Sequence, residues 1–299
     1  MRRHGHKHES FIVPFSNDIY ACPCTHDHEP TLLSFEVMPP RKPSLEAPFW
    51  QTVDQLLQVR PDFMSVTYGA GGKDRSNARA TVHRLVADTP IQPIAHLTCV
   101  GNSTAEVVST VYDYLDSGVR TFLALRGDPP AGETSWEPGP DGVASATELI
   151  HLIRTVEQRR CDAHPGEALR SAFKPLTIAV AAFPAGNPAA GTTPTQEVER
   201  LLVKQAAGAS FAITQLFWNA EVYASFVERA RRAGVHIPIV PGILPATDPA
   251  RLRRVQDLTG IEVPEQLLST LAGYQHQEQR DAFGAAFGSK LIHSVLEAG

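Results

Sequence analysis

The sequence predicts an α/β fold of the (β/α)8 TIM-barrel kind, and three observations support this. Short apolar runs rich in β-branched residues alternate with longer segments of helical period, which is typical of a parallel sheet covered by helices. The chain has 299 residues, a common length for such a barrel. The segment "EVMPPRKP" after the first expected strand lacks the glycine-rich phosphate loop of a doubly wound open sheet, the alternative architecture.

Seven segments are expected to form strands, and helical segments follow them. The strands are expected at 32–38, 63–69, 92–99, 121–127, 176–183, 211–217 and 237–243. The helices are expected at 44–59, 74–87, 103–117, 145–159, 194–207, 219–233, 248–258, 264–273 and 276–297. No segment has the pattern of an eighth strand, so the sequence predicts a barrel that lacks this strand. Either the chain is a fragment or the barrel is incomplete.

The composition narrows the class of protein. Hydrophobic residues make up 42% of the chain and the formal net charge is −5, which argues against nucleic acid or an anionic membrane as a partner. No apolar run approaches the ~18–20 residues that span a bilayer, and the N-terminus lacks the apolar core of a signal peptide. The four cysteines do not suggest a disulfide framework. We therefore expect a cytoplasmic protein, and we also expect a homo-oligomer.

Residues 1–30 differ from the rest of the chain because they are polar and rich in histidine and cysteine. We interpret them as a disordered N-terminal extension that precedes a barrel domain at 31–299. The alternative is a metal site in "CPCTHDH", with Cys22, Cys24, His26 and His28 as ligands, although this spacing matches no standard zinc pattern.

Polar side chains gather near the carboxyl ends of five expected strands. In a parallel barrel these ends meet at one face, and active sites form there. Alternation is expected to put Arg126 and Asp128 on one face of their strand and Leu123 and Leu125 on the other. The other polar residues near strand ends are Glu36, Ser65, Thr67, His96, Thr98 and Gln215.

Glu36 is the most informative of these residues, because a core strand rarely holds a carboxylate without a use or a partner. His96 alone could be a satisfied core histidine, and Arg126 with Asp128 could be a structural ion pair. Their convergence at one mouth favours a reactive site. In a partly dry cavity Glu36 would have a raised pKa and could donate a proton near neutral pH.

Seven motifs occur in order, each at a strand end, and together they resemble the bacterial type of the methylenetetrahydrofolate reductase family over about 32–295. They are "SFEVMPPR", "DFMSVTYGAGG", "PIAHLTCVG", "ALRGDPP", "VAAFPAGNP", "AGASFAITQLFWN" and "IPIVPGILP". The resemblance implies a barrel that binds FAD without a Rossmann motif. It implies ping-pong reduction of 5,10-methylenetetrahydrofolate to 5-methyltetrahydrofolate by NADH or NADPH, a step of one-carbon metabolism that feeds methionine synthesis.

The resemblance also assigns roles to residues. Glu36 matches the general acid toward folate, Asp128 matches the acid beside the flavin that also holds the pterin, and Gln215 matches a substrate-binding amide. The residues that match flavin contacts are Thr67, His96, Leu125, Arg126, Gly127 and Asp128. Further contacts around the ribityl and phosphate groups match Ala146, Ala181, Glu197 and Lys204.

The chain departs from the family pattern at several positions. Ser145 stands where a tyrosine is frequent beside the flavin, and Asn187 replaces a usual histidine. Leu271 lies near a phenylalanine that stacks on substrate or nicotinamide in some members. These departures and the absent eighth strand keep an alternative open, a catalytically impaired flavin- or folate-binding relative. Retention of Glu36, Asp128 and Gln215 favours the active enzyme.

Overall fold

The structure is a computed structural model and describes residues 31–68, 75–129, 133 and 136–298. The expected N-terminal extension, with Cys22, Cys24, His26 and His28, lies outside the described residues, so both interpretations of it stay predictions.

Seven parallel strands form one sheet in chain order, β1-β2-β3-β4-β5-β6-β7. This confirms the expected α/β barrel architecture, and within the described residues no pairing joins β1 to β7, so the sheet is an open, partial barrel. The strands are β1 (Ser34–Val37), β2 (Phe63–Val66), β3 (Gln92–Thr98), β4 (Thr121–Leu125), β5 (Thr177–Ala182), β6 (Phe211–Thr214) and β7 (Ile239–Val240).

The helices match the expected segments, with one addition. The helices are α1 (Glu46–Gln58), α2 (Arg75–Asp88), α3 (Thr104–Ser117), α4 (Ala146–Ala163), α5 (Pro165–Phe173), α6 (Pro194–Ala206), α7 (Ala220–Arg232), α8 (Pro249–Thr259), α9 (Glu265–Gly273) and α10 (Gln277–Glu297). Helix α5 was not predicted. It begins at Pro165, because a proline without an N–H is tolerated in the first turn, and its exposed Leu169 and Phe173 hide the usual pattern of a helix that faces a core.

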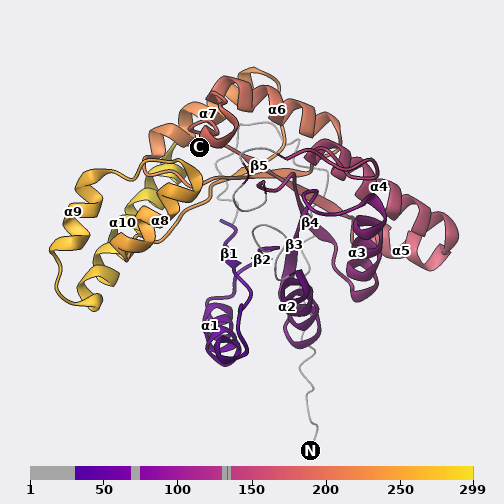
Figure 1. The fold of residues 1–299 in the computed structure, drawn as a ribbon, viewed down its shortest axis with the longest axis horizontal. Helices are drawn as coiled ribbons and strands as arrows, with labels where there is room; N and C mark the ends of the chain where they lie inside the picture. Colours follow the sequence, from indigo (N-terminus) through magenta and orange to yellow (C-terminus); the bar gives the residue numbers. More distant parts are fainter. Residues whose placement is uncertain (1–30, 69–74, 130–132, 134–135, 299) are drawn as a thin grey trace, which may run out of the picture.

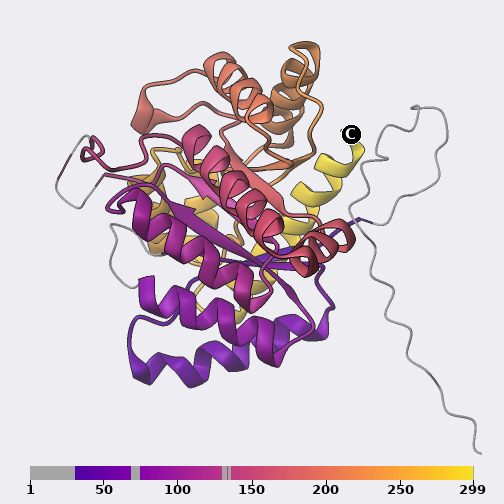
Figure 2. The ribbon, with the colours of Figure 1, turned by 90° about the vertical axis from the view of Figure 1, so that its right-hand side faces the viewer.

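The helices surround the outer face of the sheet (Figure 1). From α1 to α7 they follow the strands in an arc, and α8, α9 and α10 lie together between α7 and α1. Figure 2 shows the same layers from the side, with helices packed along the strands. In the part of the chain that the structure describes, no helix is both long enough and apolar enough to cross a membrane.

The core has three parts. The main cluster fills the layer between strands and helices and includes Met64, Phe122 and Ile178. A smaller cluster of strand residues fills the concave side of the sheet, with Ile94, Leu123, Ala179 and Phe211. A third cluster joins α8, α9 and the segment after β7, with Ala246, Leu252, Val263, Leu267, Leu268 and Leu271.

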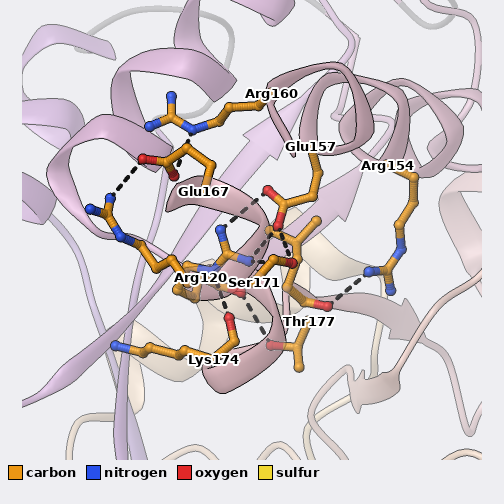
Figure 3. A network of polar contacts seen from close by, with 10 residues as sticks. Arg120, Arg154, Glu157, Arg160, Glu167, Ser171, Lys174 and Thr177 are labelled. Carbon is orange, nitrogen blue, oxygen red and sulfur yellow. Dashed lines mark hydrogen bonds and ion pairs between the residues drawn. The ribbon is translucent and has the colours of Figure 1, made fainter. Parts of the chain in front are cut away.

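The amino end of the sheet carries a network of ion pairs and hydrogen bonds around Arg120 and Glu157 (Figure 3). Arg120, directly before β4, forms a buried ion pair with Glu157 of α4, and its Nε donates to the carbonyl oxygen of Lys174 at 2.9 Å. Ser171 of α5 donates to Glu157 at 2.7 Å. Arg154 donates to the carbonyl oxygen of Leu176 at 2.8 Å. Helix α5 therefore closes this end of the sheet by completing the network around Arg120 and Glu157.

Candidate active site

The carboxyl end of the sheet holds the sequence-predicted polar residues, although most of them lie beyond the strands themselves. The strands are shorter than expected, so Thr67, Arg126, Gly127 and Gln215 follow the last residues of β2, β4 and β6. The backbone hydrogen bonds between strands end where neighbouring strands separate into loops. The site is therefore built from strand-to-loop junctions, where active sites of this fold form.

Alternation along β4 is as expected for its leucines. Leu123 and Leu125 belong to the concave side of the sheet, and Ala124 belongs to the layer under the helices. The roles of Arg126 and Asp128 stay predictions. These two residues are exposed and follow the strand, where Gly127 turns the chain with a positive φ of 89°.

Gly127 is a position that only glycine satisfies without strain. A Cβ there would lie 3.2 Å from carbons of Thr98 and Val100, in addition to the unfavourable backbone angle. The neighbouring Arg126 carbonyl accepts from Cys99 at 3.1 Å and from Val100 at 3.0 Å. The turn after β4 is thereby fastened to the end of β3.

Glu36 of β1 and His96 of β3 meet on the concave side of the sheet. Nε2 of His96 lies 3.9 Å from Oε2 of Glu36, slightly too far for a hydrogen bond. The side chain of His96 is 6% exposed and that of Glu36 is 55% exposed, so a buried base faces an acid at the mouth. Nε2 of His96 is buried without a hydrogen-bond partner among the described residues, which is rare in a native fold.

Burial favours the uncharged form of both side chains. Loss of hydration raises the pKa of Glu36 above its ordinary value, although part of this side chain still reaches solvent. Burial lowers the pKa of His96 to about 4, so its imidazole is neutral near pH 7. An acid that keeps its proton to higher pH is suited to general acid chemistry.

Thr67 and Gln215 join neighbouring strands at the same end. The Thr67 N–H donates to the Val37 carbonyl oxygen at 3.1 Å, and the Gln215 N–H donates to Ala182 at 2.8 Å. The Gln215 side-chain oxygen accepts from the N–H of Leu216 at 2.9 Å, so its amide NH2 points away from that bond. Among the described residues the amide NH2 of Gln215 has no hydrogen-bond partner, so it can donate to a ligand.

A second polar group lies at the end of β5 and on α6. Lys204 donates to the Ala181 carbonyl oxygen at 2.7 Å, and burial lowers the pKa of this lysine to about 8. The side chain of Glu197 is 1% exposed and binds Arg200 at 3.0 Å. Glu197 also accepts a short hydrogen bond from Thr192. Two of the residues predicted to contact the cofactor are thus bound to protein partners here.

Three further residues named from the sequence have local structural partners. Ala146 is the first residue of α4, and the preceding Ser145 caps that helix by accepting from the Glu148 N–H at 3.2 Å. Asn187 accepts from Ala190 at 3.3 Å and so caps a short 3₁₀ turn. The departures at positions 145 and 187 from the family pattern therefore coincide with capping roles.

The structure does not place Leu271 in the site. Leu271 is fully buried in the cluster of α8 and α9. Its expected contact with substrate or nicotinamide stays a prediction, and the structure gives this side chain a core position that its place in the sequence did not reveal.

Sequence reasoning missed two polar groups near these junctions. Arg75 donates to Asn102 at 2.7 Å and to the Val100 carbonyl oxygen at 2.9 Å, which holds the segment after β3. Trp218, three residues after Gln215, has a buried indole N–H without a partner among the described residues. The motif "QLFW" was the available signal for Trp218, and Arg75 gave none because its partners are distant in sequence.

Known proteins share both the fold and the sequence pattern. A Clostridium thermocellum protein, described as uncharacterized and binding two copies of 5-methyl-5,6,7,8-tetrahydrofolic acid, superimposes with a TM-score of 0.55. It is 14% identical, and the match covers 90% of this chain and 85% of that one, which shows the fold alone.

Relatives with higher identity carry one name. The 5,10-methylenetetrahydrofolate reductase of Salmonella typhimurium is 30% identical over 268 residues, covering 89% of this chain and 82% of the relative. That of Buchnera aphidicola subsp. Acyrthosiphon pisum is 32% identical over 240 residues, covering 80% and 74%. The family model described as methylenetetrahydrofolate reductase matches residues 24–299. The chain belongs to the methylenetetrahydrofolate reductase family.

Proposed function

We propose that this protein reduces 5,10-methylenetetrahydrofolate to 5-methyltetrahydrofolate, with electrons that NADH or NADPH delivers through bound FAD in a ping-pong sequence. Family membership supports the reaction class. The observation that carries the proposal is Glu36, an acid with a raised pKa at the carboxyl end of the sheet. In this role the enzyme would supply methyl groups for methionine synthesis.

The described residues fit a flavin at the reacting end of the site. His96 lies beside Glu36 on the concave side of the sheet, and the turn at Gly127, which is fastened to the end of β3, would bring backbone groups to the flavin. Thr67, Leu125, Arg126 and Asp128 would complete this part. When bound, the flavin supplies the hydride that reduces the folate.

The fit is weaker at the ribityl and phosphate end. Of the residues assigned there, Lys204 donates to Ala181 and Glu197 binds Arg200 and Thr192. One N–H of the Lys204 ammonium is used by the Ala181 carbonyl oxygen, which leaves two donors for a phosphate. Ala146 at the start of α4 has no polar side-chain atom that a protein partner could bind, and it would contact the cofactor with its backbone and methyl group.

The chain's own side chains account for the acid–base part of the reaction. Protonated Glu36 donates its proton to the amine nitrogen of the five-membered ring of the folate, and the adjacent carbon–nitrogen bond breaks to give an iminium ion. The carboxylate of Asp128 would stabilise the cation that develops on the pterin. The amide of Gln215 would hold the substrate.

One observation favours a second candidate, a relative that binds flavin or folate without turnover. The protein contacts of Lys204 with Ala181 and of Arg200 with Glu197 engage two cations of α6 that could otherwise bind the phosphate groups of FAD. Such a protein would bind a reduced folate and show no NAD(P)H-dependent product.

A turnover experiment separates the candidates. Purified protein is titrated with FAD, then mixed without oxygen with NADH or NADPH and with 5,10-methylenetetrahydrofolate. We expect saturable FAD binding at micromolar concentrations and 5-methyltetrahydrofolate by mass spectrometry. Folate binding without product supports the second candidate, and absence of both ligands from the protein contradicts both. Sedimentation velocity on the same sample tests the predicted homo-oligomer.

A further inference from the structure

The unpartnered nitrogen of His96 faces Glu36 across an intervening strand. Strand β2 lies between β1 and β3, and Glu36 is paired in register with Ser65 of β2. Neighbouring strands lie ~4.8 Å apart, so side chains on β1 and β3 meet only above a small residue on β2. Ser65 is such a residue and is itself buried. Because Ser65 is paired with Ile94 of β3, two residues before His96, Glu36 and His96 face each other on a diagonal across β2.

The contact is nearly formed in the structure. The 3.9 Å between His96 Nε2 and Glu36 Oε2 exceeds a hydrogen bond of ~2.9 Å by about 1 Å. Glu36 is half exposed, so rotation of its side chain can close this gap, whereas His96 is held by burial. Closure would satisfy the buried Nε2 atom and would fix one carboxyl oxygen of Glu36.

We propose that His96 is the positioning residue for Glu36, and that its Nε2–H donates to Oε2 of Glu36 and so presents Oε1 to the substrate. Because His96 is neutral, it carries one N–H, and this proposal assigns it to Nε2. The assignment rests on the proposed function only for the identity of the substrate, since the pairing itself belongs to the folded chain.

Glu36 supplies the transferred proton, and His96 keeps its own. Oε1 of Glu36 carries the proton that passes to the amine nitrogen of the folate as the carbon–nitrogen bond of the ring breaks. Glu36 is left as a carboxylate, and the His96 N–H stabilises that charge without moving its own proton. His96 therefore acts through Glu36 and takes no part in electron transfer.

Among the described residues, no second ionisable group accounts for the two pKa shifts. Ser65 of β2, Thr67 directly after that strand, and Leu123 and Leu125 of β4 are the uncharged neighbours on this side of the sheet. Burial is the cause of both pKa shifts. A donor hydrogen bond to a carboxylate lowers the pKa of that acid, so loss of His96 is expected to raise the pKa of Glu36 further.

Nuclear magnetic resonance on the full chain tests the pairing without turnover. Protein with ¹³C-labelled glutamate side chains and ¹⁵N-labelled histidine is titrated, and Glu36→Gln assigns the Glu36 signal. We expect the Nε2–H tautomer of His96 and a Glu36 pKa about 1 unit higher in His96→Leu than in the wild type. His96→Gln, which keeps an N–H donor, should restore most of the difference.

The matched control is Leu123→Val, because Leu123 is paired in register with His96 and lines the same side of the sheet. It should leave the Glu36 pKa unchanged. The proposal would be overturned if the proton of neutral His96 lies on Nδ1. It would also be overturned if the Glu36 pKa is the same in the wild type and in His96→Leu.

Kinetics then separate positioning from flavin binding. With FAD at saturation, we expect the folate half-reaction of His96→Leu to fall about 10²-fold more than its flavin reduction does, and in the Glu36→Gln background the His96 change should add little. Equal losses in both half-reactions, with weaker FAD binding, would contradict the proposal. If the wild type forms no product, the proposed function fails, and the resonance titration still decides the pairing.

Discussion

The two ends of the sheet hold ionisable side chains in opposite ways. At the amino end, Arg120 and Glu157 are buried together, and every neighbour shown in Figure 3 completes a hydrogen bond or an ion pair. At the carboxyl end, His96 is equally buried, yet its Nε2 has no partner among the described residues and Glu36 stops 3.9 Å away. Arg120 and His96 are buried to a similar extent, but only Arg120 has all its side-chain nitrogens hydrogen-bonded among the described residues.

The difference indicates what each end does. A fully paired polar network holds chain segments together, and here it fastens α4 and α5 to the starts of β4 and β5. An unpaired buried atom costs free energy that folding alone does not explain, so it points to a ligand or a moving partner. In barrels of this kind, the carboxyl end carries function and the amino end carries stability.

The largest effect on stability should come from the amino end. Glu157→Gln leaves the Arg120 guanidinium buried without a countercharge, and we expect a loss of about 3–5 kcal/mol in the free energy of unfolding. Urea unfolding measures it. Glu228→Gln, in an exposed pair with Arg232, is the control and should cost about 0.5 kcal/mol or less. A small loss in Glu157→Gln would mean that the two ends do not differ as described.

Acid titration of stability should report the carboxyl end. The pKa of His96 is about 4 in the folded protein and near 6.5 when unfolded, so the unfolded state binds more protons between these values. The contribution of neutral His96 is therefore fully present above about pH 6.5 and is lost as pH falls toward 4. His96→Gln should remove up to about 3 kcal/mol of this pH dependence, measured as unfolding free energy at several pH values. Parallel pH curves for the two proteins would show that His96 is not buried as described.

Glycine substitutions sharpen the account of the turn after β4. Gly127→Ala combines a positive φ with close contacts and should cost about 1–3 kcal/mol. Gly191 has a positive φ of 61° with open space, and Gly139 has open space alone, so the alanine variants at these positions separate strain from crowding. We expect melting temperatures in the order 139, 191 and 127, from highest to lowest. A Gly127 variant as stable as the Gly139 variant would contradict the assigned tight turn.

The smallest effect is expected from the N-terminal segment. Residues 1–30 lack apolar periodicity, so deletion of 1–28 should change neither the melting temperature nor the FAD affinity. Thermal melts and flavin titration check this. A marked drop in either quantity, or the loss of bound zinc, would instead support the metal site.

The sequence predicted the fold well because alternating apolar runs and helical periods are local signals. It predicted the neighbourhood of Glu36 and His96 because parallel strands bring their carboxyl ends together. It did not show contacts with partners that are distant in the chain. Leu271 packs in a core that α8 and α9 create. The amino-end network joins Arg120 to Glu157 and Ser171 across 37 and 51 residues, which no sequence motif reveals.

One measurement tests the central claim that the carboxyl end of the sheet performs acid chemistry on folate. Stopped-flow spectroscopy follows each half-reaction of Glu36→Gln, beside a thermal melt of the same protein. The account predicts a flavin reduction rate close to wild type, a folate half-reaction slower by at least ~10²-fold, and an unchanged melting temperature, because Gln keeps the shape and removes the transferable proton. Equal losses in both half-reactions with a lowered melting temperature would show that Glu36 is a structural carboxylate and would contradict the account.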